Sequence, residues 1–129
     1  MNPKQFLTVG GVILVLVGIL GFVNVIGPSA DKSIFGEAWW FDNAENWTHL
    51  ILGIVALIAA YALPKNLHKP LVLLVGIVGI IVGVYSIFTP TLGAANLENP
   101  ADTILHLAIG VWALVAGMGK APAMTGPMT

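Results

Sequence analysis

The stretch that decides the fold is residues 6–26, FLTVGGVILVLVGILGFVNVI, which carries no charged side chain. A helix that crosses the hydrocarbon core of a membrane needs about 20 mainly apolar residues. Three further apolar stretches follow at residues 47–63, 71–88 and 104–118, and the first and last of these contain one histidine each. The sequence therefore predicts an all-α bundle of four transmembrane helices.

The second and fourth helices are expected to begin before their apolar runs. Asp42 is followed three residues later by Glu45, and Asn99 is followed three residues later by Asp102. An N-cap residue with an acid at this spacing is typical of a helix start. Pro100 suits the first helical position, where its missing N–H costs nothing. We expect one helix directly after Asp42 and one from about Pro100.

The composition excludes most soluble classes. Apolar residues make up 57% of the 129-residue chain and charged residues 9%, whereas a soluble domain carries about 25% charged residues. The chain has no Cys and no Arg, so thiol chemistry and bidentate phosphate recognition are excluded. With no catalytic motif either, we expect a non-enzymatic integral membrane protein that does not bind nucleic acid.

Charges divide between the two ends of the expected helices. Four of the five lysines fall on one side, and all six acids fall on the other side with Lys32. The positive-inside rule then places both termini in the cytoplasm, most simply of a prokaryotic inner membrane. The four lysines are Lys4, Lys65, Lys69 and Lys120, and the acids are Asp31, Glu37, Asp42, Glu45, Glu98 and Asp102.

The chain contains an internal repeat. A shift of 57 residues superposes residues 42–59 on residues 99–116 with seven identities, and a shift of 65 aligns glycines of the first and third helices. We therefore expect a single membrane domain over residues 1–129, with repeat 1 at 6–63, repeat 2 at 71–118 and a flexible tail at 120–129. Because each repeat holds two helices, both copies cross the membrane in the same sense.

Each repeat carries an acid, a histidine and a glycine at four-residue steps, which places them on one helix face. Ionisable groups in a membrane span are costly and indicate function. The residues fit structural hydrogen bonding, pH sensing, ligation of a haem or chlorophyll-type tetrapyrrole beside the two glycines, or a divalent metal held by the histidines and acids. The two sets are Glu45, His49 and Gly53, and Asp102, His106 and Gly110.

A scaffold role is the main functional expectation. Gly79 and Gly83 form a small-xxx-small pair of the kind that brings membrane helices together. The protein would then be a subunit of a homo-oligomer or of a larger membrane complex. His68 is expected to be a solvated residue of the connection between the second and third helices, and Trp112 to fill a lipid-facing or inter-helix groove.

Residues 46–53, NWTHLILG, resemble the N-x-x-H-L-x-x-G signature of a family of small bacterial four-helix membrane proteins of unknown function. Residues 103–110 keep His-Leu-x-x-Gly but have Thr in place of Asn. The resemblance implies the four-span layout and brings no activity with it.

Overall fold

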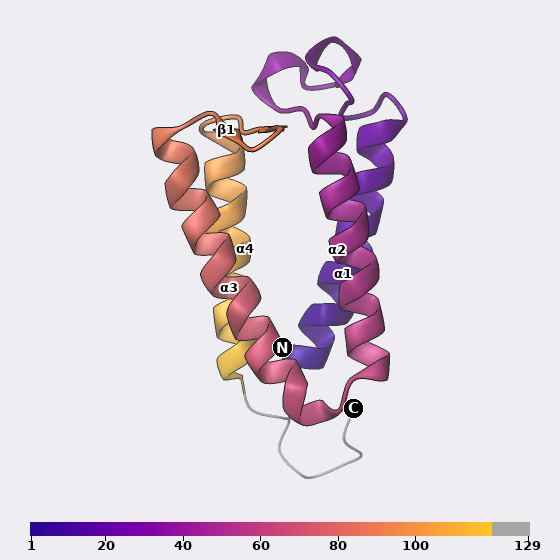
Figure 1. The fold of residues 1–129 in the computed structure, drawn as a ribbon, viewed down its shortest axis with the longest axis vertical. Helices are drawn as coiled ribbons and strands as arrows, with labels where there is room; N and C mark the ends of the chain where they lie inside the picture. The colour runs from indigo at the N-terminus through magenta and orange to yellow at the C-terminus, as the bar shows by residue number, and fades with distance from the viewer. Residues whose placement is uncertain (120–129) are drawn as a thin grey trace.

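The computed structural model describes residues 1–119 and contains four long helices (Figure 1). Each is long and apolar enough to cross a membrane, which confirms the expected four-helix, all-α architecture. The predicted tail at 120–129, with Lys120, lies outside the described residues. The helices are α1 (Pro3–Phe22), α2 (Asn43–Ala62), α3 (Lys65–Phe88) and α4 (Ala101–Met118), joined in part by short 3-10 turns η1 (Ala30–Lys32) and η2 (Gly36–Ala38) and strands β1 (Thr91–Leu92) and β2 (Ala95–Asn96).

The start of α2 follows the prediction. The Asp42 side chain accepts a hydrogen bond from the Glu45 backbone N–H at 2.9 Å, and the Asp42 N–H donates to Glu45 Oε1 at 3.3 Å. These two bonds satisfy donors that a helix start leaves unpaired. The capping box fixes α2 to begin at Asn43.

One predicted helix end was wrong. α1 ends at Phe22 rather than at residue 26, because Asn24 has a φ of 63° and the N–H groups of Val25 and Ile26 turn back to the Leu20 carbonyl. α4 begins at Ala101, close to the expected start near Pro100, but Pro100 is the N-cap rather than the first helical residue.

Asn99 is not the cap of α4 either. Its side-chain amide donates to the Ser86 carbonyl at 3.5 Å. Asp102 instead accepts from the Glu98 backbone N–H at 2.7 Å, so this acid orders the chain before the helix.

α3 begins earlier than its apolar run, and this changes the position of His68. α3 begins at Lys65, six residues before the apolar run, and places His68 in its first two turns with 5% of its surface exposed. The Nε2–H of His68 donates to the Ala59 carbonyl of α2 at 2.9 Å. His68 is therefore a buried residue that ties α2 to α3, and the prediction of a solvated loop residue was wrong.

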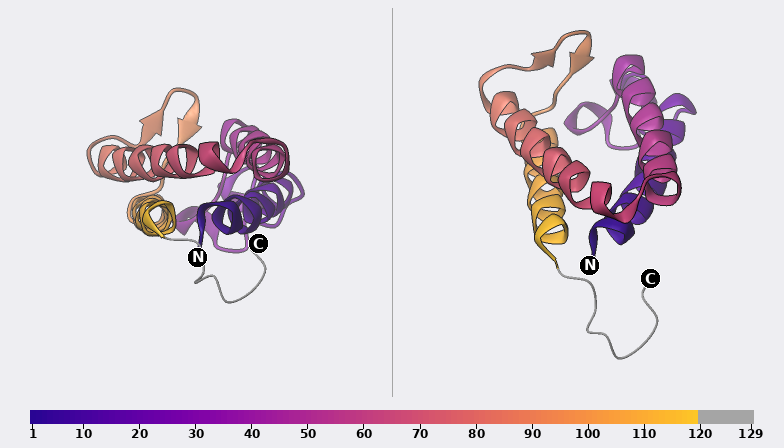
Figure 2. Two further views of the ribbon diagram at one scale, coloured as in Figure 1. Left: turned by 90° about the horizontal axis from the view of Figure 1, so that it is seen from below. Right: turned by 60° about the horizontal axis from the view of Figure 1, so that its bottom comes forward.

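The helices pair into two tight hairpins, α1 with α2 and α3 with α4, while α2 and α4 do not pack along each other (Figures 1 and 2). Repeat-equivalent residues make equivalent contacts. A Cβ on Gly11 would meet the Leu57 side chain at 2.9 Å, and one on Gly76 would meet the Leu114 side chain at 2.7 Å. The shifts of 65 and 57 residues relate these two contacts.

The small residues of α3 face α4 rather than an open surface. A Cβ on Gly79 would lie 3.1 Å from the Cα of Gly110, and one on Gly83 would lie 2.7 Å from the Leu107 side chain. The pair that suggested oligomer formation is thus already used inside the second hairpin.

The hairpins join at the end that carries Lys4, Lys65 and Lys69, here called the lysine end. A core of small and apolar side chains fills this junction, and Trp112 packs edge-to-face on Phe6 with ring centroids 4.7 Å apart. Trp112 thus fills an inter-helix groove, one of the two positions expected for it. The core residues are Phe6, Leu7, Ala59, Ala60, Val72, Ala113 and Ala116.

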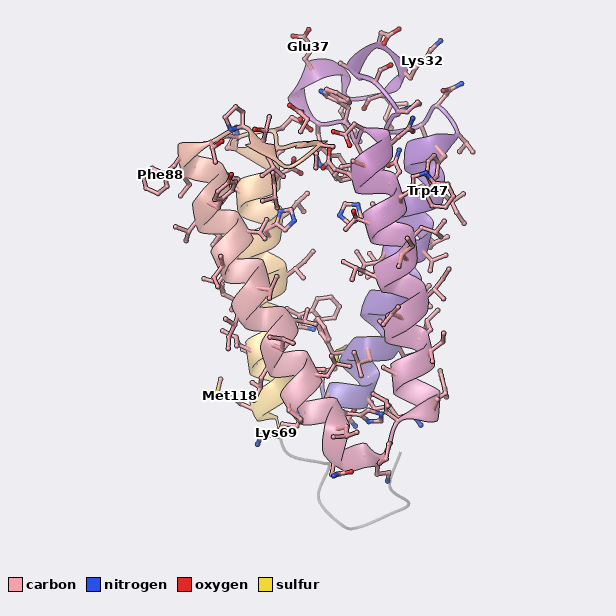
Figure 3. All side chains as sticks on the ribbon, in the orientation of Figure 1. Lys32, Glu37, Trp47, Lys69, Phe88 and Met118 are labelled. Carbon is pink, nitrogen blue, oxygen red and sulfur yellow. The ribbon has the colours of Figure 1, made fainter. Side chains whose placement is uncertain are left out.

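The opposite end is the acidic end. Figure 3 shows Lys69 and Met118 at one end of the molecule and Lys32 and Glu37 at the other. The charge separation expected from the sequence is therefore present along the long axis of the bundle.

Candidate functional site

The interface between hairpin α1–α2 and hairpin α3–α4, here called the seam, holds the predicted acids and histidines at its acidic end. Glu45 and Asp102 are buried, with 5% and 0% of their surfaces exposed, and lie close enough for their charges to interact. His49 and His106 are half-buried and also lie within electrostatic range of each other. The structure thus brings these four residues together from the two hairpins.

The two predicted glycines lie elsewhere. A Cβ on Gly53 would meet the backbone nitrogen of Val15 in α1 at 2.7 Å, and one on Gly110 would meet the backbone nitrogen of Ile80 in α3 at 2.8 Å. These glycines allow close contact within each hairpin, and the space beside them is filled by helix backbone. The side of each glycine where a Cβ would lie therefore has no room for a macrocycle.

The two histidines have different hydrogen bonding. The Nδ1–H of His106 donates to the Asp102 carbonyl at 2.7 Å. This bond places the proton on Nδ1 and leaves the Nε2 lone pair as an acceptor or ligand, the arrangement common in metal-ligating histidines. His49 packs edge-to-face on Phe41 at 5.0 Å, and its buried Nδ1 has no hydrogen-bond partner.

Two reciprocal hydrogen bonds close the seam at the acidic end. The Trp40 N–H of the first hairpin donates to Glu98 Oε1 at 3.1 Å, and the Asn96 N–H of the second donates to Asp42 Oδ2 at 2.6 Å. The two bonds are reciprocal in sequence. Asp42 follows Trp40 by two residues, and Glu98 follows Asn96 by two residues. We call this pair of bonds the clasp.

Several buried polar atoms near the clasp lack partners. They include one oxygen of Glu98, one oxygen of Asp102 and the indole N–H of Trp39, in addition to His49 Nδ1. Trp39 lies near the Asp102 carboxyl but completes no hydrogen bond with it. Because most buried polar groups in proteins are paired, such a concentration is unusual.

An apolar cavity of about 170 Å³ lies in the seam on its lysine side. It is partly open to the outside, because the Leu52 and Val55 side chains that line it are about half exposed. Leu52 and Ile109 line the end of the cavity that is nearer the acidic end. Leu52 follows His49 by three residues and Ile109 follows His106 by three, which is about 4.5 Å along each helix. Much of the lining consists of repeat-equivalent pairs, so the cavity lies between corresponding surfaces of the two hairpins. These pairs are Phe6 with Leu71, Gly10 with Val75, Leu52 with Ile109, and Val55 with Trp112.

Sequence reasoning missed Glu98 and His68. Glu98 lies in a connection, and the only signal for it is that Trp40-x-Asp42 and Asn96-x-Glu98 share a spacing. His68 lies among charged residues next to Pro70, which resembles a loop in the sequence.

Within residues 1–119, no three His, Asp or Glu side chains are grouped so that they could hold a metal ion. No family model matches the chain, and neither a curated protein nor a solved structure matches it. The resemblance to the four-helix family therefore stays a prediction.

Burial raises the pKa of Glu98 from 4.5 to about 7, and the carboxylates of Asp102 and Asp42 add to this effect, while the Trp40 hydrogen bond opposes it. Between these pH values the folded protein holds a proton at Glu98 that the unfolded chain has lost. Stability from this group is therefore present at acidic pH and is lost as the pH rises through 7.

We expect the wild-type protein to be less stable at pH 8 than at pH 5. Glu98→Gln, which keeps an acceptor for Trp40, should reduce that difference by about 1 kcal/mol, a small value because Glu98 is only partly buried. Thermal unfolding in detergent at both pH values measures it. Asp42, Glu45 and Asp102 also face Glu98, so the comparison with the variant isolates its share. Equal pH dependence in both proteins would contradict the assignment.

Proposed function

We propose that this chain is a non-catalytic integral membrane protein that binds a small membrane-soluble ligand in the seam between its two hairpins. The observation that carries the proposal is an apolar cavity that begins about one helical turn from His49 and His106, where buried polar atoms without hydrogen-bond partners gather. Ligand pockets are mostly apolar with a few polar groups that fix orientation. A ligand with an apolar body and a polar head would satisfy both parts.

The proposal includes the membrane placement. The lysine end would face the cytoplasm and the acidic end the opposite side, so the polar head would bind near the outer surface of a prokaryotic inner membrane. The equivalent contacts of the two hairpins support their origin by duplication, with the seam along the pseudo-two-fold axis.

The cavity volume limits the ligand. A cavity of about 150 Å³ holds a molecule the size of benzene, and the seam cavity is about 170 Å³. A short chain or a single ring matches this volume, and a haem or chlorophyll-type tetrapyrrole is larger than it. The tetrapyrrole and metal proposals retain one supporting observation, the free Nε2 lone pair of His106.

The scaffold role is also retained as a proposal, with weaker support. Its motivating residues Gly79 and Gly83 pack inside the second hairpin. Association with a second copy or another subunit would have to use other surfaces.

The test of ligand binding uses 6-bromohexanol, whose bromine quenches tryptophan fluorescence at short range. Trp112 lines the cavity, and the difference in quenching between the wild-type protein and Trp112→Phe, both in zwitterionic nanodiscs, isolates its signal. We expect saturable quenching that Gly10→Val removes, because a Cβ there meets nothing nearer than the Phe6 ring at 3.9 Å and the valine would fill cavity space. Leu16→Val on the exposed face of α1 is the control. Unsaturable quenching in every variant would overturn the proposal.

The two histidines should act as a pair. We expect His49→Ala and His106→Ala each to weaken 6-bromohexanol binding about tenfold and the double variant to add little, because groups that share one ligand are not additive. Tyr61→Ala is the control: it removes an exposed ring that does not line the cavity and should leave the dissociation constant unchanged. Additive small losses would mean two separate packing histidines.

A further inference from the structure

Four carboxyl groups from both hairpins converge at the acidic end of the seam. Glu45 is within electrostatic range of Asp42, Glu98 and Asp102. Asp42 and Glu45 come from the first hairpin, and Glu98 and Asp102 come from the second. The hairpins therefore place acids against acids across the seam.

No lysine side chain balances these acids within the described part of the chain. The charged neighbours that influence Glu45, Glu98 and Asp102 are other acids and His106. Lys32, the one lysine at this end, is exposed and lies near Asp31. The seam thus has an excess of acceptors and of potential negative charge.

The acceptors are also incompletely satisfied. Asp102 is fully buried, and the side-chain donor beside its carboxyl group, the Trp39 indole N–H, completes no hydrogen bond with its Oδ1. Glu98 Oε2 has no hydrogen-bond partner. The residues of the first hairpin near Asp102 are Trp39, Asp42 and Glu45, so its carboxyl group faces the seam. An unpaired buried acceptor costs about 1–3 kcal/mol, and more when it is charged.

Backbone amides already occupy the other oxygen of each acid. Glu98 Oε1 accepts from Trp40, and Asp102 Oδ2 accepts from the Glu98 amide. The remaining oxygens are therefore fixed in place rather than free to rotate towards solvent. Such a site is prepared for a group that brings both N–H donors and positive charge.

From this arrangement we infer that the ligand is a lipophilic cation, with an ammonium-type head among Glu98, Asp102 and the two histidines and an apolar body in the cavity. The inference rests on the proposed function and specifies its ligand class. A carboxylate or phosphate head would be repelled by the four acids. Above pH 7, where Glu98 is ionised, a neutral head would leave its carboxylate without compensating charge. The cavity, one helical turn further in, accommodates the apolar body.

The experiment compares three probes with the same bromoalkyl body, namely 6-bromohexylammonium, 6-bromohexanol and 6-bromohexanoate. Quenching of Trp112 in zwitterionic nanodiscs gives a saturable dissociation constant for each. We expect the ammonium probe to bind at least about tenfold more tightly than the alcohol, and the carboxylate to bind most weakly.

Substitutions of Glu98 and Asp102 test whether these acids cause the preference for the ammonium probe. Glu98→Gln and Asp102→Asn should each lower the ratio of ammonium to alcohol affinity, and two variants are used because the buried Asp102 is the less tolerant position. Glu37→Gln is the matched control, since it removes an exposed acid of η2 away from the seam and should leave the ratio unchanged.

The outcomes separate the two proposals. Saturable alcohol binding without an ammonium preference would overturn the cation inference and leave the proposed function in place. No saturable binding of any probe would overturn both. An ammonium preference that Glu37→Gln also removes would show that general surface charge, rather than the seam, attracts the cation.

Discussion

Replacing Gly53 by leucine should prevent the α1–α2 hairpin from forming. A Cβ at this position would lie 2.7 Å from the backbone nitrogen of Val15 and 2.8 Å from the carbonyl oxygen of Gly11. Both obstacles are backbone atoms, so no side-chain rotation relieves the overlap, and a full leucine would separate α1 from α2. We expect the loss of a folded, monodisperse species in mild detergent, measured by size-exclusion chromatography and by circular dichroism during heating.

Two alanine variants test whether the close contact between α1 and α2 causes this loss. Gly53→Ala and Gly10→Ala both improve helix propensity by about 1 kcal/mol. They differ in space, because a Cβ on Gly10 meets only the Phe6 ring at 3.9 Å. Gly10→Ala should therefore be neutral or stabilising, whereas Gly53→Ala should destabilise by about 1–3 kcal/mol from overpacking. Equal effects in the two variants would contradict the close helix contact.

The main features of the fold were predictable because they follow from hydropathy and local capping. Uncharged runs of membrane-spanning length identified the four helices, and Asp42 with Glu45 marked the start of α2. The length of an uncharged run and the spacing of a capping box are both properties of neighbouring residues. Tertiary contacts therefore did not change the helices that they predict.

The boundaries that failed depend on tertiary structure. The apolar residues after Phe22 leave the helix because Ile26 accepts a hydrogen bond from the Phe41 amide and pairs with Ser33. His68 belongs to α3 because its ring binds the Ala59 carbonyl. All three partners lie seven or more residues away along the chain, so hydropathy alone could not indicate them.

The candidate site was predictable in part for the same reason. The repeat marked the histidines and two of the acids, since both copies keep them at one spacing. It could not show that Gly53 and Gly110 face the helix partners within each hairpin, because a glycine stripe does not state which neighbour it meets. Glu98 joins the site through a connection that folds back across the seam.

Asp42→Ala should lower the free energy of unfolding by about 3 kcal/mol, the second large effect that we expect. The carboxyl group of Asp42 accepts from the Glu45 amide at 2.9 Å as the cap of α2 and from the Asn96 amide at 2.6 Å in the clasp. Loss of an N-cap costs about 1 kcal/mol, and loss of a charged hydrogen bond costs about 1.5–3 kcal/mol. Thermal unfolding together with amide hydrogen exchange at Asn96 measures both parts.

The chain offers a matched cap that has no part in the clasp. Asn2 caps α1 through the same capping box, with its side chain accepting from the Gln5 amide at 2.8 Å. Asn2→Ala should therefore cost only the cap, about 1 kcal/mol. Asp42→Asn should fall between the two, since asparagine caps a helix well but exchanges one acceptor oxygen for an amide that cannot accept from Asn96. If Asp42→Ala and Asn2→Ala cost the same, and exchange at Asn96 is unchanged, the clasp does not hold the hairpins together.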